Sequence, residues 1–261
     1  MHKTKQTLPH STPINPLGYP FIELTDVDSS NNYAMQQLKS GHAGHGAAFF
    51  ADHQSGGRGR RGKIWESPRG ENIILSVIID TTAFQEKSYF TFSMAMAIGV
   101  HHFFSFYAQK NISIKWPNDI YYNDRKAAGI LVENIFRGLH WNYAIVGIGM
   151  NINQVQFDPA IPNPVSLKQI TQNTYQPALL ARDLCMYLND AYELLSVNEK
   201  AVIEAYNKVL YLKNERATFK LNSEQITCTI QEVDKFGKLY IQHPVYDFLE
   251  FDTVQWVLPK K

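Results

Sequence analysis

The pattern of apolar and polar residues divides the chain near residue 213: strands and helices are predicted before it, and strands alone after it. Before that point, short apolar runs bounded by turn residues predict strands at residues 21–24, 47–51, 72–80, 112–115, 120–122, 126–136 and 141–147. Apolar residues at helical spacing predict helices at residues 89–107, 178–195 and 199–210, and polar caps at residues 29–32 predict another that runs to Lys39. After residue 213 the period becomes 2, which predicts short strands ending at residues 254–258.

These elements predict an α+β fold with a mixed, mainly antiparallel sheet, helices and a small C-terminal β-barrel. The expected division is an N-terminal tail at residues 1–20, a main domain at 21–212 and the barrel at 213–261. A length of 261 residues exceeds one typical domain of roughly 100 to 200 residues, which agrees with a main domain and an appendage.

Composition narrows the function classes. Hydrophobic residues make up 44% and charged residues 19%, which excludes a disordered or coiled-coil chain. With 25 Lys and Arg against 24 Asp and Glu, no global field attracts nucleic acid or a membrane, so an anion site must be a local patch. Two distant cysteines, Cys185 and Cys228, give neither a disulfide framework nor a CxxC metal pair. Neither a secretory signal nor an apolar run of ~20 residues is visible, which predicts a cytoplasmic protein with no membrane partner.

A glycine-rich basic segment at residues 54–63 is the candidate patch. Its residues 57–62 satisfy GxGxxG and residues 57–63 begin a P-loop, but a strand rather than a helix is predicted to follow, and Ile64 lacks the hydroxyl that binds magnesium. What remains is four cations, Arg58, Arg60, Arg61 and Lys63, on a backbone able to fold over a ligand. Guanidinium groups bind phosphate bidentately, so a nucleotide is the natural ligand. The alternatives are a solvated basic turn and a nucleic-acid patch, although no second basic stripe supports the latter.

A second group of residues could bring two amines and a carboxylate together. Lys115 and Lys126 are predicted on adjoining strands, with Asp119 at the start of the hairpin between them. Alternatively, Asp119 closes an Asx turn and Lys126 is an exposed strand lysine. Gly129 suits the close approach of a ligand or a neighbouring strand.

Glycines at the end of the strand that finishes near residue 150 form a third candidate feature. In the segment 146–153 they leave space rather than fill it, which favours a pocket wall, and a β-bulge explains them nearly as well. The histidine pair at residues 101–102 is interpreted as structural or solvated.

Together these segments resemble the catalytic module of the biotin protein ligases. Residues 54–65 are similar to the adenylate-binding loop of that family, 115–133 to its KWPND and RKxxGILxE block, and 147–151 to its GxGxN segment. Residues 28–31 resemble its DSTN stretch, with Ser30 where threonine is common, and serine keeps the hydroxyl. The resemblance implies a class II synthetase-like catalytic domain and an SH3-like barrel. About 20 residues precede the first strand, too few for the winged helix-turn-helix of bifunctional members, so we expect no DNA-binding repressor activity and no nucleic-acid partner.

The activity that the resemblance implies is a two-step ligation. Biotin reacts with ATP to form biotinyl-5'-AMP, and the biotinyl group then passes to a lysine of a biotin carboxyl carrier protein. Mg²⁺ is expected to be carried by ATP and not by a protein cage. The resemblance allows a monomer or a homodimer.

The resemblance also implies roles for individual residues. Those expected to act in catalysis are Lys126, Asp119, Arg60 and Lys115. Those expected to bind biotin are Ser29, Ser30, Asn31, Gln54, Gly57, Arg58 and Gly129. Those expected to bind ATP or the adenylate are Arg58, Arg60, Arg61, Trp65, Asn118, Lys126 and Asn151.

Within the catalytic group, Arg60 would hold the adenylate and Lys126 would polarise oxygens where negative charge develops. Lys115 would position a phosphate or its magnesium, and Asp119 would orient, or deprotonate, the incoming amine. Trp65 would pack against the adenine or the closed loop, or else be a core tryptophan.

Two other functions are compatible with parts of the sequence. A lipoate or octanoate ligase or transferase activates a similar acid, but the GRGRRG and KWPND combination argues against it. A non-catalytic nucleotide or nucleic-acid binding module would explain the basic loop alone, and it leaves Asp119 and Lys126 unexplained.

Overall fold

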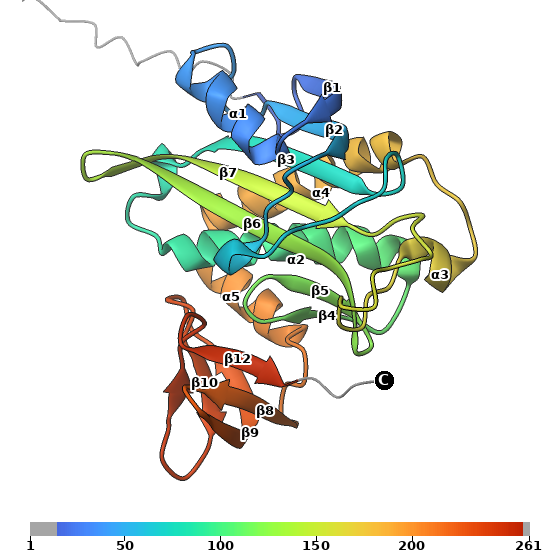
Figure 1. Ribbon diagram of the computed structural model, residues 1–261. Coiled ribbons are helices and arrows are strands. Elements are labelled where there is room, and N and C mark those ends of the chain that lie inside the picture. The colour runs from blue at the N-terminus through green and yellow to red at the C-terminus, as the bar shows by residue number, and fades with distance from the viewer. Residues whose placement is uncertain (1–14, 258–261) are drawn as a thin grey trace, which may run out of the picture.

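Two β-sheets form the framework of the chain (Figure 1). The computed structural model describes residues 15–257, so most of the predicted tail and the last residue of the predicted final strand lie outside the described residues. The strands of the larger sheet are β1 (Phe21–Val27), β2 (Ala48–Gln54), β3 (Ile73–Asp80), β4 (Ile112–Lys115), β5 (Asp119–Tyr122), β6 (Arg125–Arg137) and β7 (His140–Met150). Their order is β1-β2-β3-β7-β6-β5-β4, and β1 and β2 pair in parallel while the other neighbours are antiparallel.

Helices cover both faces of this sheet. They are α1 (Ser30–Lys39), α2 (Tyr89–Ala108), α3 (Leu167–Thr171), α4 (Pro177–Val197) and α5 (Glu199–Lys208), with short 3₁₀ turns at Arg60–Gly62 and Thr82–Phe84. On β3, Ile78 packs with Ala34 of α1, whereas Val77 and Ile79 belong to the large core that includes α2 and α4. Because a strand alternates its side chains between faces, burial on both faces explains the nearly continuous apolar run of β3.

Helix α2 is the centre of the large core. Most of its residues are buried all round, since the sheet lies on one side and α4 and α5 on the other. Gly99 allows the close approach of α4, because a Cβ at this position would come within 2.8 Å of the Tyr187 carbonyl oxygen. His101 is also buried here, and its Nε2 lies 3.3 Å from the Ile112 carbonyl oxygen. Burial lowers the pKa of His101 to about 4, so the imidazole is neutral at neutral pH.

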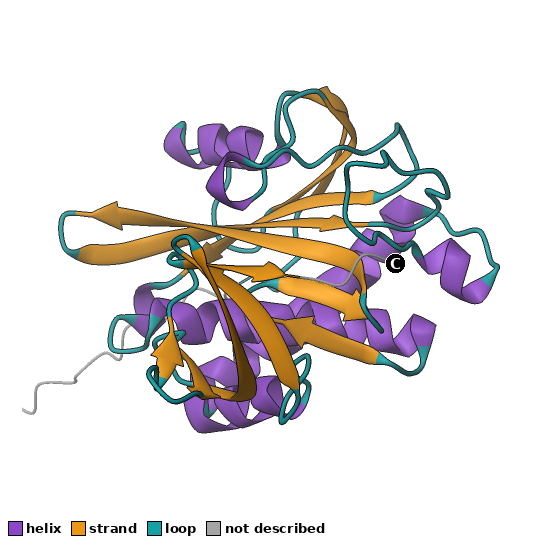
Figure 2. Cartoon of the chain, turned by 60° about the horizontal axis from the view of Figure 1, so that its bottom comes forward, coloured by secondary structure: helices purple, strands orange, loops and turns teal. Residues whose placement is uncertain are grey.

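The second sheet is antiparallel and lies at the bottom of the view in Figure 1. Its strands are β8 (Arg216–Leu221), β9 (Glu224–Val233), β10 (Leu239–Gln242), β11 (Phe248–Leu249) and β12 (Val254–Val257), in the order β11-β10-β9-β8-β12. It is attached to α5 through Asn207, whose side chain donates to the Val233 carbonyl and accepts from the Val233 N–H at 2.8 and 2.7 Å. Figure 2, from below, shows it in front of the helices that line the larger sheet.

The fold class predicted from the sequence is confirmed, and each of its predicted helices and strands is present with small changes at the ends. The short helix α3 was not predicted. A domain boundary at residues 212–213 stays a prediction; the second sheet begins at Arg216. Among residues 15–257, none of the helices combines the length and apolar character required to cross a lipid bilayer.

Candidate active site

A cavity of about 890 Å³ opens where the basic loop and the second sheet face the surface of the larger sheet. Every residue that the resemblance assigned to catalysis or ligand binding lines it, with one exception. The exception is Gly57, which is buried behind the cavity wall; a Cβ there would collide with the amide of Gln54 and the carbonyl of Trp65. Gly57 therefore supports the wall and does not face the cavity.

An ion-paired triad lies on the floor of the cavity. Asp119 Oδ1 lies 2.7 Å from Lys126 Nζ, and Asp119 Oδ2 lies 4.0 Å from Lys115 Nζ. Hairpin pairing explains this convergence, because Lys115 ends β4 opposite Asp119, and Lys126 of β6 pairs with Tyr121, two residues further along β5. The expectation that the two lysines lie on adjoining strands is wrong: they flank β5 on either side, which leaves the carboxylate between them.

Burial and charge act in opposite directions on this triad. Burial raises the pKa of Asp119, but the charges of Lys126 and Lys115 together lower it by more. The pKa of Asp119 is therefore below its usual value. Burial lowers the pKa of Lys115 to about 8, although Asp119 partly offsets the effect. Asp119 is therefore a stable carboxylate, and neither a solvated Asx turn nor an exposed strand lysine describes the pair.

The basic loop is held by protein partners at each arginine. Arg58 Nη2 donates to both carboxylate oxygens of Glu133 at 3.0 Å. Arg60 lies with its guanidinium 4.5 Å from the centre of the Phe251 ring, and it pairs with Asp252 at 3.2 Å. Two of these partners belong to the second sheet and its loops, so the loop bridges the two sheets.

Arg61 has a different kind of partner. Its guanidinium donates to the backbone carbonyls of Phe251 and of Val254, the latter at 3.2 Å. Its own backbone has a φ of +56°, which turns the loop at this point. Arg61 was expected to bind ATP or the adenylate; in this conformation its donors are used to fix the loop against the second sheet.

The chain after the loop contains no helix before β3, as the sequence predicted. A dinucleotide or P-loop site requires a helix N-terminus directly behind the glycines to hold the phosphates. Both motif matches are therefore coincidental.

A polar network forms one end of the cavity, where α1 begins. Ser76 Oγ donates to Asn31 Oδ1 at 2.6 Å and lies 2.8 Å from Ser30 Oγ. Asn31 Nδ2 in turn donates to Glu133 at 2.6 Å. Gly147 makes room for this arrangement, because a Cβ there would collide with the Asn31 amide. These groups supply donors and acceptors beside apolar strands, which suits a small ligand with one polar end.

Sequence reasoning missed Ser76 and gave Glu133 no role. The one signal for Ser76 is that it is the only polar residue inside the apolar run 73–79, a position where an uncompensated hydroxyl would be costly. Glu133 lies in the recognised motif, and its importance comes from binding Arg58 and Asn31 at once.

Trp65 packs against two glycines of the larger sheet. A Cβ at Gly149 would lie 2.3 Å from its ring and one at Gly129 would lie 3.3 Å from it, so these glycines make room for the indole. Lys126 Nζ lies 5.6 Å from the centre of the ring, and the indole Nε1 is buried without a protein partner. The segment 147–150 pairs in regular register on both sides, which supports the pocket-wall interpretation of its glycines over a bulge.

Two asparagines expected to bind ATP are engaged with the backbone. Asn118 donates from its side chain to the Ile130 carbonyl. Asn151 is buried, and its Nδ2 donates to the Val165 carbonyl at 3.1 Å. Both line the cavity, and both hold neighbouring strands and loops in place.

Residues of the second sheet complete the cavity wall. Phe251, Val254, Gln255 and Trp256 all line it. None carried a signal in the sequence, because their place in the site depends on the chain folding back: Trp256 Nε1 donates to the Trp116 carbonyl, 140 residues away, at 2.9 Å.

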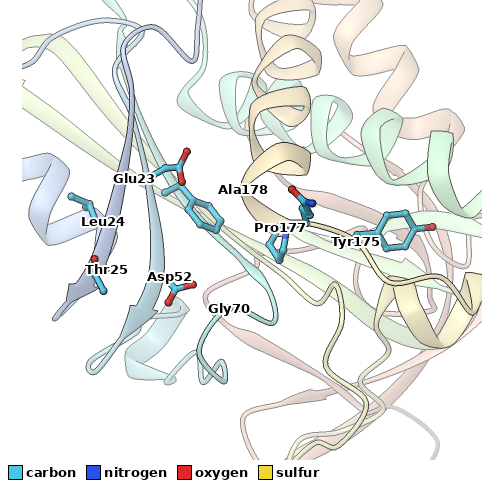
Figure 3. Close-up of a pocket in the computed structure, with 10 residues that line it drawn as sticks. Glu23, Leu24, Thr25, Asp52, Gly70, Tyr175, Pro177 and Ala178 are labelled. Atoms are coloured by element: carbon cyan, nitrogen blue, oxygen red, sulfur yellow. The ribbon is translucent and has the colours of Figure 1, made fainter.

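A second cavity, of about 380 Å³, lies between β1, β2 and the start of α4 (Figure 3). Its two carboxylates are already paired, Glu23 with Arg182 at 2.8 Å and Asp52 with Arg69 at 3.4 Å. None of the residues predicted for catalysis or binding lines it. The chemistry that the sequence indicates is therefore confined to the larger cavity. Within residues 15–257, no group of three or more His, Cys, Asp or Glu side chains could hold a metal ion.

Comparison with known proteins finds relatives in sequence and in fold. Residues 23–151 match the sequence model of the Biotin/lipoate A/B protein ligase family. The Escherichia coli protein Bifunctional ligase/repressor BirA is 27% identical over 221 residues, which cover 83% of this chain and 67% of that protein. The Bacillus subtilis protein of the same name is 33% identical over 156 residues, covering 59% of this chain and 46% of its own length, so the match spans about half of that relative.

A solved structure of a biotin protein ligase from Aquifex aeolicus, in complex with biotin and ATP, superimposes with a TM-score of 0.72 at 23% identity, covering 92% of this chain and 95% of that one. The fold is thus that of the biotin protein ligases: a mainly antiparallel sheet with helices, followed by a small C-terminal sheet. Residues 23–151, about half of the chain, carry the sequence pattern of the Biotin/lipoate A/B protein ligase family.

Proposed function

We propose that this chain is an ATP-dependent biotin protein ligase that forms biotinyl-5'-AMP and transfers biotin to a lysine of a biotin carboxyl carrier protein. The observation that carries the proposal is the arrangement of Lys126, Asp119 and Lys115 in the same cavity as the arginine loop. A cavity of about 890 Å³ is large enough for a vitamin joined to a nucleotide. The Aquifex aeolicus protein is called a biotin protein ligase and was solved with biotin and ATP, and the Escherichia coli protein is called a ligase, which supports the same activity.

In the first step, an oxygen of the biotin carboxylate attacks the α-phosphorus of ATP, and the bond from that phosphorus to the pyrophosphate oxygen breaks. Negative charge accumulates on the phosphoryl oxygens as this happens. Lys126 supplies a cation on the floor of the cavity, and Arg60 supplies another beside Phe251. Such fixed charges stabilise the transition state more than the ground state. Mg²⁺ bound to the phosphates of ATP would neutralise part of their charge.

In the second step, the amine of the acceptor lysine attacks the carbonyl carbon of the mixed anhydride, the carbon–oxygen bond to the phosphate breaks, and AMP leaves. Asp119 faces the cavity with a carboxylate that stays ionised, because its pKa is lowered by the two lysines. It is suited to orient the amine and to neutralise Lys126, and the proton released by the amine passes to solvent. The lysine amine must be neutral to attack. Its ordinary pKa of about 10.4 keeps it mostly protonated at neutral pH, so it must lose a proton first.

Biotin is expected to occupy the end of the cavity at the start of α1. The polar network of Ser30, Asn31 and Ser76 provides partners for a ureido group, while Ile74 and Ile148 provide apolar lining. Arg58 is held beside this end by Glu133, the carboxylate that also binds Asn31.

The test is incubation of the full chain with biotin, MgATP and a biotin carboxyl carrier domain, followed by mass measurement of the acceptor. A gain of one biotinyl group is expected with wild type, and Lys126→Ala should lower the rate by about 100-fold or more. Lys200→Ala is the matched control, because Lys200 is a lysine with an 85% exposed side chain on α5, paired with Glu204.

Three results would count against the proposal. Labelling by Lys126→Ala at the wild-type rate removes the role of that amine. Transfer of lipoate or octanoate in place of biotin assigns the chain to the other branch of the family, and binding of ATP without any transfer makes it a nucleotide-binding module.

A further inference from the structure

The Lys115 ammonium lies between two aromatic rings that come from different sheets. Its Nζ is 5.2 Å from the centre of the Tyr121 ring on β5 and 4.9 Å from the centre of the Trp256 ring on β12. Asp119 is the nearest carboxylate at 4.0 Å, and that carboxylate pairs more closely with Lys126 at 2.7 Å. The Asp119 carboxylate thus interacts mainly with Lys126. The Tyr121 and Trp256 rings therefore determine the position of the Lys115 amine.

Trp256 is itself held firmly. Its ring packs at 4.5 Å from Phe219 and at 5.9 Å from Tyr211, measured between ring centres. Its indole N–H donates to the carbonyl of Trp116, the residue that follows Lys115. One side chain of the second sheet therefore fixes both the backbone beside Lys115 and the ammonium at the end of its side chain.

A lysine needs such support at this position. Its side chain has four rotatable bonds, and the aromatic faces attract the ammonium without accepting a directional hydrogen bond that would compete with a phosphate oxygen. The other charged groups that act on Lys115 are Asp119, Lys126 and Lys63, and both lysines repel it. Without a ring on the side of the second sheet, repulsion from Lys126 would favour conformations in which the amine leaves the cavity.

We propose that Trp256 is a positioning residue that holds the Lys115 amine toward the phosphates of the nucleotide, so that the C-terminal sheet completes the ATP end of the site. The proposal rests on the proposed function and adds that the two ends of the cavity act separately, with Trp256 affecting the nucleotide end and not the biotin end. Within the part of the chain that the structure describes, Trp256 makes no hydrogen bond or ring contact with Ser30, Asn31 or Ser76 at the other end of the cavity, so biotin binding should not depend on it.

The experiment measures two affinities on the full chain. One is for biotin alone, and the other is for α,β-methylene-ATP with magnesium and saturating biotin, an analogue whose bridge cannot be split. Trp256→Leu should weaken binding of the analogue by about tenfold and change biotin affinity by less than about twofold. Trp256→Phe keeps a ring and loses the indole N–H, and it should recover most of the loss. Trp256→Met takes the place of the leucine variant if circular dichroism shows that the leucine variant is unfolded.

Phe248→Leu is the matched control. Phe248 also faces a lysine, with Lys238 Nζ 3.9 Å from its ring centre, but it lies on β11 at the opposite edge of the same sheet. This variant should leave both affinities unchanged. An equal loss for biotin and the analogue in Trp256→Leu would mean that Trp256 supports the fold only, and it would overturn the proposal.

A double-mutant cycle separates positioning from a direct contact with the nucleotide. In a Lys115→Met background, Trp256→Leu should cause no further loss of analogue affinity, because the residue through which it acts is gone. An undiminished loss in that background would overturn the proposal. If wild type binds neither ligand, the proposed function fails; if it binds both and Trp256→Leu has no selective effect, only the positioning role fails.

Discussion

Replacing Lys115 with methionine should stabilise the folded chain while it weakens nucleotide binding. The Lys115 side chain is only 9% exposed, and Asp119 at 4.0 Å compensates its charge incompletely. Methionine has a similar length and no charge to bury, so the substitution removes the cost of desolvation without opening a large cavity.

The size of the effect follows from the pKa of Lys115, which burial lowers from 10.5 to about 8. Each pKa unit corresponds to about 1.4 kcal/mol, so the protonated lysine costs about 3 kcal/mol in the folded state at pH 7. The net gain in Lys115→Met is smaller if methionine packs imperfectly. For a chain of this size, 1 kcal/mol shifts the melting temperature by about 2 to 4 °C, so an increase of about 5 to 10 °C is expected.

The pH dependence provides the sharper check. The folded pKa of Lys115 is depressed, so between about pH 8 and 10.5 the unfolded chain binds more protons than the folded chain, and wild-type stability rises with pH in this window relative to the variant. The cost is fully present below about pH 8 and disappears above 10.5. At pH 9.5 the advantage of Lys115→Met should have fallen to about half of its value at pH 7 or less.

Thermal unfolding followed by circular dichroism at pH 7 and pH 9.5 measures both effects. Lys200→Met, at an exposed lysine of α5, should show no difference from wild type at either pH. A Lys115→Met chain that melts below wild type at pH 7, or an advantage that is equal at both pH values, would refute the argument that a buried charge is being removed.

Three further predictions concern the walls of the cavity. Arg61→Met should release the basic loop from the second sheet, and limited proteolysis should cut within residues 58–64 at least about fivefold faster than in wild type; an unchanged rate would mean that the carbonyl contacts do not hold the loop. Gly149→Ala should displace Trp65, change the tryptophan fluorescence and lower the ligation rate by about tenfold or more. Gly44→Ala, at a glycine with open space around it, should be neutral, and equal rates for the two variants would contradict the steric argument. Glu133→Gln should weaken biotin binding by about tenfold in equilibrium dialysis, because it replaces a charge-assisted hydrogen bond to the arginine beside the pocket by a neutral one, and full affinity in the variant would exclude this role.

Local pattern determined much of the fold. Strand β3 and helix α2 were predicted within one or two residues of their ends, because a continuous apolar run and a 3.6-residue period are properties of the chain itself. Helix α3 was missed although its capping box, Ser166 with Gln169, is visible in the sequence, since five residues are too few to establish a period. The parallel pairing of β1 with β2 has no local signal, because it depends on where α1 returns the chain.

The candidate site divides in the same way. Sequence spacing brought Lys115, Asp119 and Lys126 together, because hairpin pairing turns positions along the chain into neighbours in space. Only the tertiary structure decided that Arg61 binds carbonyls of the second sheet and that Trp256 closes over Lys115. Contacts between segments more than a hundred residues apart depend on how two separately formed sheets pack, and nothing in the local pattern of either segment encodes that packing.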